Sequence, residues 1–222
     1  MKLIVFDIDD TLTKSENQHI NSFVKTMQHF GISDIDKNWS EYEHLTDSFI
    51  LQENYERNLN KKFQLSFIDE FEARMTAFIR DLPTVSEVPG AKLVINFLAD
   101  HSDFAFAFAT GSLLQPACLK LKQAEITFHR SLLSASNKFL TREEIVNQAI
   151  SLAQAVYHVE QFEDIVSVGD GLWDLRTAKN LNLKFVGIGE KNRLAFEKEN
   201  VKHHLTDWTE VDLNRLLSFF EE

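Results

Sequence analysis

Short apolar runs bounded by polar or turn residues recur along the chain and predict strands. The clearest are Lys2–Phe6 and Phe104–Ala109, followed by residues 164–168 and 183–188. In the run FAFAFA, large and small apolar side chains alternate. A strand there would place Phe on one face and let a helix approach closely on its Ala face. A weaker strand is expected at residues 130–134 and a short edge element around residues 203–206.

Helical periods of apolar residues fill the stretches between these runs. Ser15 and Gln18 predict a capping box for a first helix, which should end near Gly31. Thr141 and Glu144 predict a second capping box. Further helices are expected near residues 47–59, 66–80, 91–101, 113–124, 172–181, 191–199 and 209–220.

The alternation of strands and helices favours an α/β fold, with a doubly wound and mainly parallel sheet. Almost a hundred residues without a convincing strand separate the first strand from FAFAFA. Aromatic and charged residues are mixed there at helical periods. We therefore expect residues 14–85 to form an inserted α-helical cap domain, and residues 1–13 and 86–222 to form one discontinuous core domain.

The amino-acid composition and net charge argue against several classes of protein. The 222 residues carry a net charge of −11, which argues against nucleic acid and anionic membranes as partners. Cys118 is the only cysteine, so an intramolecular disulfide is excluded and a reducing cytoplasmic setting is expected. No apolar run approaches the roughly 20 residues of a membrane span. The first strand turns acidic where a signal peptide would stay apolar.

Two acidic clusters follow predicted strands. Asp7, Asp9 and Asp10 end the first, and Asp170 and Asp174 follow the fourth. Either cluster alone could be a turn or a helix cap. Parallel strands, however, bring their carboxyl ends to one edge, where open α/β sheets bind ligands. Carboxylate oxygens crowded there suit Mg²⁺, which accepts one or two protein carboxylates together with a substrate phosphate.

Polar and basic residues at other predicted strand and helix ends could bind phosphate. Thr110, Gly111 and Ser112 follow FAFAFA next to a predicted helix start, where a hydroxyl and backbone N–H groups can bind phosphate oxygens. Lys138 and Arg142 are the candidate cations. We choose Arg142 because it stands at a capped helix terminus, and interpret Lys138 as a solvated residue.

The order strand–DxDxT, strand–TGS, a basic residue at a helix start and strand–GDxxxD resembles the haloacid dehalogenase-like superfamily over the full chain. The resemblance is to its phosphatase branch with a helical cap, similar to phosphoglycolate phosphatase and beta-phosphoglucomutase. It implies Asp7 as nucleophile, Asp9 as acid and base, and Thr110 as a phosphate-binding hydroxyl. It also implies that Asp170 is a metal ligand, with Asp174 as its acidic partner.

These roles describe a Mg²⁺-dependent phosphatase that acts on a small phosphorylated metabolite through an aspartyl-phosphate on Asp7. The metal site would draw on Asp7, Asp9, Asp170 and Asp174, and Arg142 would hold the phosphate with Thr110, Gly111 and Ser112. The cap segment 44–48 offers Thr46 and Asp47 as substrate-binding residues, although either could be only a helix cap. A phosphomutase and a non-catalytic regulatory protein are the alternatives.

Overall fold

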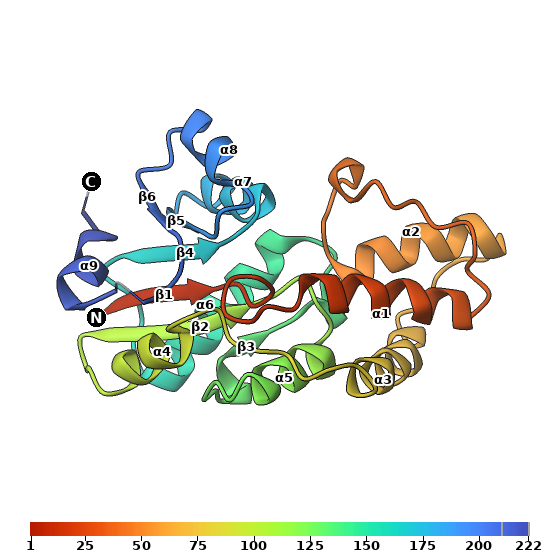
Figure 1. The fold of residues 1–222 in the computed structure, drawn as a ribbon, viewed down its shortest axis with the longest axis horizontal. Helices are drawn as coiled ribbons and strands as arrows, with labels where there is room; N and C mark the ends of the chain where they lie inside the picture. The colour runs from red at the N-terminus through yellow and green to blue at the C-terminus, as the bar shows by residue number, and fades with distance from the viewer. Residues whose placement is uncertain (210, 222) are drawn as a thin grey trace.

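The computed structural model describes residues 1–209 and 211–221. Within them, six parallel strands form one sheet in the order β3-β2-β1-β4-β5-β6 (Figure 1). The strands are β1 (Lys2–Phe6), β2 (Phe104–Ala109), β3 (Leu133–Ser134), β4 (Ile165–Gly169), β5 (Lys184–Ile188) and β6 (His203–Leu205). The prediction of a parallel, doubly wound sheet is confirmed.

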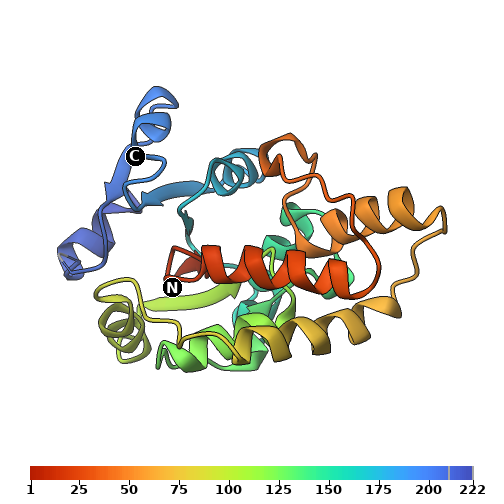
Figure 2. The same ribbon diagram turned by 45° about the vertical axis from the view of Figure 1, so that its right-hand side comes forward.

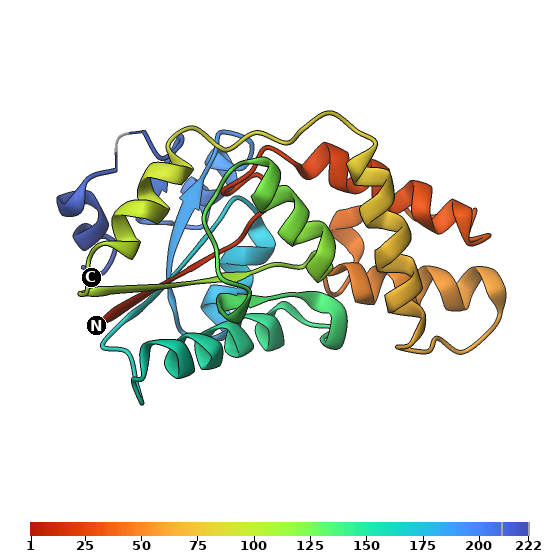
Figure 3. The same cartoon turned by 90° about the horizontal axis from the view of Figure 1, so that it is seen from below.

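Helices connect these strands and extend the molecule beyond the sheet. They are α1 (Glu16–His29), α2 (Asp47–Leu59), α3 (Phe67–Arg80), α4 (Ala91–Ala99), α5 (Leu114–Gln123), α6 (Arg142–Tyr157), α7 (Leu172–Asn180), α8 (Arg193–Lys198) and α9 (Leu213–Ser218). Figure 3 shows α4 and α5 on one face of the sheet and α6 on the other. This layering is the reason that the central strands are apolar on both faces.

Strand β1 lies at the centre of the sheet, between β2 and β4. All six residues of β2 are buried, as FAFAFA predicts, and Phe108 pairs in register with Phe6. The Phe6 ring also packs edge-on against Trp208, with ring centroids 5.4 Å apart. Phe6 also pairs in register with Val168 of β4, so the ends of β1, β2 and β4 lie together in one apolar layer and the residues that follow them start from fixed positions.

Helices α1, α2 and α3 lie between β1 and β2 in sequence and extend away from the carboxyl edge of the sheet (Figures 1 and 2). They bury their own apolar cluster, in which Phe71, Met75 and Leu51 are fully enclosed. Leu113, next to α5, joins that cluster. The inserted helices thus have a separate core that touches the sheet layer beside the end of β2.

The chain enters and leaves the inserted helices through two adjacent connections. The Lys14 N–H donates to the Ser86 carbonyl at 2.9 Å, and the Val88 N–H donates to the Leu12 carbonyl at 2.8 Å. Thr13 and Glu87 pair as an antiparallel bridge. The two ends of the insertion are therefore held side by side.

Several predicted element ends differ from those observed. The weak strand at 130–134 is reduced to β3, because residues 130–132 form a turn of 3₁₀ helix. The predicted helix at 209–220 is reduced to α9, and residue 210 lies outside the described residues. The Thr141–Glu144 capping box is confirmed.

The capping box predicted at Ser15 is wrong. The Ser15 hydroxyl donates to Asp9 instead, and the carboxylate of Asp10 accepts the N–H groups of Ser15 and Glu16 at 3.0 and 3.1 Å. Asp10 thus caps α1, a role that helical spacing from Ser15 does not reveal.

Among the helices described, none is long and apolar enough to span a membrane.

Candidate active site

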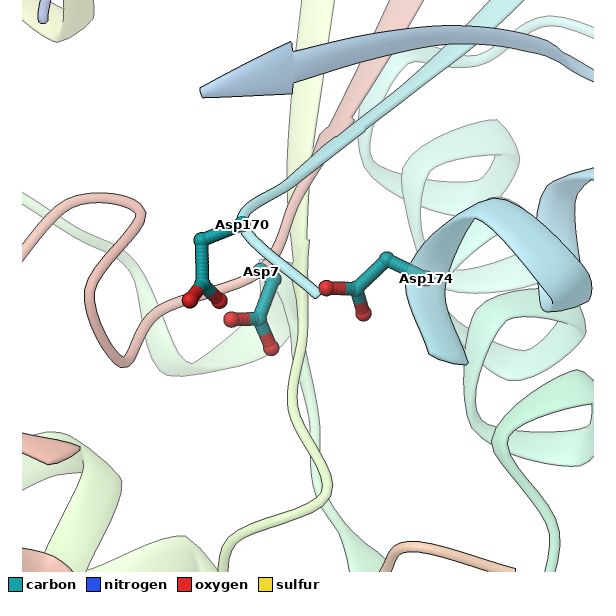
Figure 4. Close-up of side chains that lie close together, drawn as sticks. All are labelled: Asp7, Asp170 and Asp174. Atoms are coloured by element: carbon teal, nitrogen blue, oxygen red, sulfur yellow. The ribbon is translucent and has the colours of Figure 1, made fainter. Parts of the chain in front are cut away.

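Three carboxylates meet at the carboxyl edge of the sheet (Figure 4). Asp7 follows β1, Asp170 follows the adjacent β4, and Asp174 stands in the first turn of α7. Oxygen atoms of all three lie within 4.8 Å of one another, and each residue is at most 6% exposed. Gly169 makes this approach possible, because a Cβ there would overlap the Asp174 carboxylate.

Burial and crowding make this cluster hold protons unless a cation is present. Burial, together with the nearby Asp174, raises the pKa of Asp7 to about 8. Burial, then Asp174 and Asp7, raises the pKa of Asp170 to about 9, and burial also raises the pKa of Asp174. A bound cation would favour the ionised form of these groups, and carboxylate oxygens are the ligands that a hard divalent cation such as Mg²⁺ prefers.

Arg142 lies against the same cluster, as its place at the start of α6 predicts. Its Nη1 donates to Asp174 at 2.7 Å and to Asp7 at 3.3 Å. Burial opposes the charge of the guanidinium, but Asp174 and Asp7 outweigh it and raise the pKa of Arg142. A permanent positive charge thus stands beside Asp7, within reach of an anionic group bound there. Lys138, the other candidate cation, is exposed.

Asp9 points into a different environment from Asp7. The Lys120 ammonium donates to both oxygens of the Asp9 carboxylate, at 2.6 and 2.5 Å, and the Ser15 hydroxyl donates as well. Burial alone would raise the pKa of Asp9, but Lys120 and then His19 lower it to about 2. Asp9 is therefore ionised, and its carboxylate is not part of the three-carboxylate cluster.

Sequence reasoning missed Lys120. It is completely buried on α5, on the same helix face as Ala117 and Leu121. A lysine at a core position of an amphipathic helix is the signal that could have found it, because a buried ammonium needs an anionic partner. Its Nζ also lies 3.3 Å from both the Ser112 hydroxyl and the His19 ring.

The loop Thr110–Ser112 follows β2 at the same edge. Thr110 and Ser112 are buried, and the Thr110 hydroxyl accepts the Ser112 N–H at 3.1 Å. The Gly111 carbonyl accepts the Asp47 N–H at 2.8 Å. This loop therefore lies beside the acidic cluster and also holds the inserted helices.

Thr46 and Asp47 are buried where α2 meets the core. Thr46 caps α2 and donates its hydroxyl to the Leu140 carbonyl at 2.8 Å. Asp47 accepts the Leu113 N–H at 2.9 Å and contacts His19. Both side chains thus join the inserted helices to the core, and their role in binding substrate stays a prediction.

A cavity of about 550 Å³ lies between the inserted helices and the sheet edge. On the core side it is lined by Asp9, Thr110, Gly111, Ser112 and Arg142. On the other side it is lined by α1 and by the segment that leads into α2. These five residues therefore face a cleft large enough for a small organic ligand, and Arg142 joins this cleft to the three-carboxylate cluster.

Solved structures of other proteins have the same fold. An Entamoeba histolytica HAD hydrolase of family IA, variant 3, aligns over 100% of both chains (TM-score 0.72, 13% identity). A beta-phosphoglucomutase from Clostridium difficile covers 98% of this chain and 96% of its own (TM-score 0.67, 16% identity). CbbY from Rhodobacter sphaeroides, solved in complex with phosphate, covers 96% of this chain and 98% of its own (TM-score 0.66, 21% identity).

Comparison of the sequence with protein-family profiles identifies the family. A search of curated protein sequences found no match. The family profile of haloacid dehalogenase-like hydrolases matches residues 4–188, which include both acidic clusters, the Thr110–Ser112 loop and Arg142. The chain belongs to the haloacid dehalogenase-like hydrolases.

Proposed function

We propose that this protein is a Mg²⁺-dependent phosphatase that hydrolyses a small phosphorylated metabolite through an aspartyl-phosphate on Asp7. The observation that carries the proposal is the contrast between Asp7 and Asp9. Asp7 lies among acidic oxygens beside Arg142, whereas Asp9, two residues later, is an ionised carboxylate beside Lys120.

The acidic cluster would hold the cation through Asp7, Asp170 and Asp174. A bound Mg²⁺ would supply positive charge that screens the repulsion between the Asp7 carboxylate and a phosphate dianion. Arg142 adds a permanent positive charge at the same place. The Thr110 hydroxyl and the backbone N–H groups of its loop are suited to bind the remaining phosphate oxygens.

In the first step an oxygen of Asp7 attacks phosphorus, and the bond from phosphorus to the ester oxygen breaks. The leaving oxygen takes a proton from Asp9 when the alcohol is a poor leaving group. With its pKa at about 2 beside Lys120, Asp9 must lose part of that contact to carry the proton. In the second step water attacks the phosphoryl group, Asp9 accepts its proton, and phosphate and the Asp7 carboxylate are released.

The inserted residues 14–85 would act as a cap over this chemistry. Contacts from Thr46 and Asp47 to the core hold the cap against the sheet edge beside the cavity. A closed cavity excludes water and strengthens the electrostatic interactions inside it. The cap would therefore determine which phosphate esters bind, while the core residues carry out the reaction.

A phosphate-release assay with a panel of phosphomonoesters tests the proposal. EDTA should abolish release and Mg²⁺ should restore it, with Ca²⁺ a poor substitute because calcium prefers more ligands and looser geometry. Asp7→Asn should lose activity on every ester. Mass spectrometry of acid-quenched wild-type enzyme should find the phosphoryl group on the peptide that contains Asp7.

The same assay separates the alternatives. A phosphomutase would return the phosphoryl group to an isomeric sugar phosphate without releasing free phosphate. A regulatory protein would show neither product. Full activity in EDTA, or a phosphoryl label on Asp9, would contradict the assigned roles.

A further inference from the structure

The cavity beside Asp9 and Arg142 is larger than a phosphate and a two- or three-carbon alcohol would fill. Its volume is about 550 Å³, within the range of about 300–1,000 Å³ that holds drug-sized ligands. The space beyond the phosphate site therefore has room for a sizeable leaving group. The side chains around that space indicate its chemistry.

Trp173 forms one wall of the cavity on the core side. It immediately precedes Asp174, and the Arg142 guanidinium lies 5.9 Å from its ring centre. The indole packs on the backbone of Gly171, where a Cβ would overlap the ring. A flat aromatic surface is thus fixed directly beside the acidic cluster.

Aromatic side chains also line the cavity on the cap side. Trp39, Tyr42 and His44 come from the segment that connects α1 to α2. The Trp39 and Tyr42 rings stack with centroids 6.1 Å apart, and the His44 ring packs edge-on against Phe49 at 4.9 Å. Three rings therefore face the same space as Trp173.

This aromatic segment is held in place although it is largely irregular. The Tyr42 hydroxyl donates to the Asp36 carbonyl at 3.0 Å and accepts the side-chain N–H of the buried Asn54 at 2.6 Å. Asn58 accepts the backbone N–H groups of residues 33 and 34. Because α2 fixes the segment at both places, the rings present a preorganised surface and binding would cost little ordering.

The charges around the cavity do not favour a second phosphate. Lys37 and Arg176 line it together with Glu43 and Glu143, and Lys191 is paired there with Glu16. The signs of these groups balance, so the part of the cavity away from Arg142 has no net positive charge. The aromatic rings are the largest uncharged surfaces left to recognise a ligand there.

We propose that the natural substrate is the phosphate monoester of an alcohol that carries a flat aromatic or heteroaromatic ring, with the ring bound by Trp39, Tyr42 and Trp173. The inference rests on the proposed phosphatase activity and specifies its substrate class. Aromatic rings prefer offset or edge-to-face contact with other aromatic rings, which a saturated ring of the same size cannot reproduce.

Three esters of primary alcohols with similar acidity test the proposal: benzyl, cyclohexylmethyl and ethyl phosphate. Their chemical step is equally difficult, so differences in kcat/KM report recognition. Differential transition-state binding should give benzyl phosphate a kcat/KM about 100-fold above ethyl phosphate and about 10-fold above cyclohexylmethyl phosphate. Equal values for all three, with Asp7-dependent phosphate release, would overturn the ring proposal and leave the phosphatase intact.

Substitutions of the aromatic residues test which side chains recognise the ring. Trp39→Leu should reduce the benzyl-to-ethyl ratio about 10-fold, and Trp39→Phe should restore most of it. Phe78→Leu is the matched control, since Phe78 is an aromatic residue of the inserted helices that does not line the cavity. A ratio that falls equally in the control would mean that the effect is only structural, which contradicts the proposal.

If no ester is hydrolysed, binding measurements can still test the ring proposal independently of the phosphatase proposal. Absence of turnover would contradict the phosphatase proposal. Titration calorimetry of benzylphosphonate and ethylphosphonate with the Mg²⁺-loaded wild-type protein would then decide ring recognition. Tighter binding of benzylphosphonate, weakened by Trp39→Leu, supports it, and equal affinities refute it.

Discussion

At the scale of single residues, the environment of Asp9 departs most from what its motif suggests. Asp7 and Asp9 stand two positions apart in one turn, yet their pKa values shift in opposite directions, to about 8 and about 2. Burial and the nearby Asp174 raise the pKa of Asp7, whereas the buried Lys120 is the largest influence that lowers the pKa of Asp9. Lys120 lies on a helix more than a hundred residues away, so the DxDxT motif alone says nothing about it.

We predict that Lys120→Met raises the pKa of Asp9. Without the ammonium, burial is the main remaining influence, and it favours the protonated carboxyl. Hydrolysis of the phospho-enzyme needs ionised Asp9, so the acidic limb of the kcat profile should move to higher pH. Rapid-quench measurement of dephosphorylation against pH checks this. Arg74→Met, on α3 and outside this cluster, is the control, and an unchanged acidic limb in Lys120→Met would refute the prediction.

The same variant should also be less stable. Removal of one partner from a fully buried ion pair typically costs about 3–5 kcal/mol. Lys120 is fully buried but Asp9 is 18% exposed, so we expect a loss at or below the lower end of that range, measured by urea unfolding. The lowered pKa of Asp9 means that its contribution to stability is present above about pH 4 and is lost as the pH falls toward 2.

At the scale of elements, a carboxylate from the inserted helices binds the start of α5. Glu72, on α3, is buried and accepts the Gln115 backbone N–H at 2.8 Å. It also accepts side-chain N–H groups of Gln115 and Asn137 at 3.1 and 2.9 Å. An anion at a helix N-terminus satisfies backbone donors that have no partner within the helix.

We predict that Glu72→Ala lowers the free energy of unfolding by about 1–3 kcal/mol, because it leaves buried donors without an acceptor. Glu72→Gln should lose less, since its amide oxygen can still accept the backbone N–H. Glu70→Ala, exposed on the same helix, should stay within about 0.5 kcal/mol of the wild type. Urea unfolding measures all three, and an equal loss in Glu70→Ala would rule out the specific contact.

Elements defined by local pattern could be predicted from the sequence, and those that depend on tertiary partners could not. FAFAFA and the Thr141–Glu144 box are recognisable because their signals lie within a few residues. The Ser15 box fails because Asp9 and Asp10 compete for the same groups. In the site, strand ends predict that Asp7 and Asp170 meet, whereas the Lys120 contact arises only when α5 packs beneath the inserted helices.

At the scale of the whole molecule, the acidic cluster links stability to pH and to metal. The pKa values of Asp7 and Asp170 are raised to about 8 and about 9, so the metal-free folded protein holds more protons than the unfolded chain between about pH 4 and 9. The free energy of unfolding should therefore fall as the pH rises through this window. A cation bound to the ionised cluster would reverse the loss.

We predict that in EDTA the Tm is lower at about pH 8.5 than at about pH 5.5, and that Mg²⁺ raises it mainly at the higher pH. Asp170→Asn should reduce both effects, because it removes a carboxylate that titrates in this range. Asp100→Asn, at the exposed end of α4, should reduce neither. A Mg²⁺ effect of the same size at both pH values would contradict the coupling.

The paired connections at Lys14–Ser86 and Leu12–Val88 have a consequence for how such a molecule can diversify. Since the two ends of the insertion are tied together on the core, the strands do not need the inserted helices to bring these ends together. A helical module from another protein could be spliced between these positions if it again supplied the contacts that Asp47 and Glu72 make with the core. The junction is thus a suitable place for recombination. An exchanged insertion would change substrate specificity, while the core residues that carry out the reaction would stay the same.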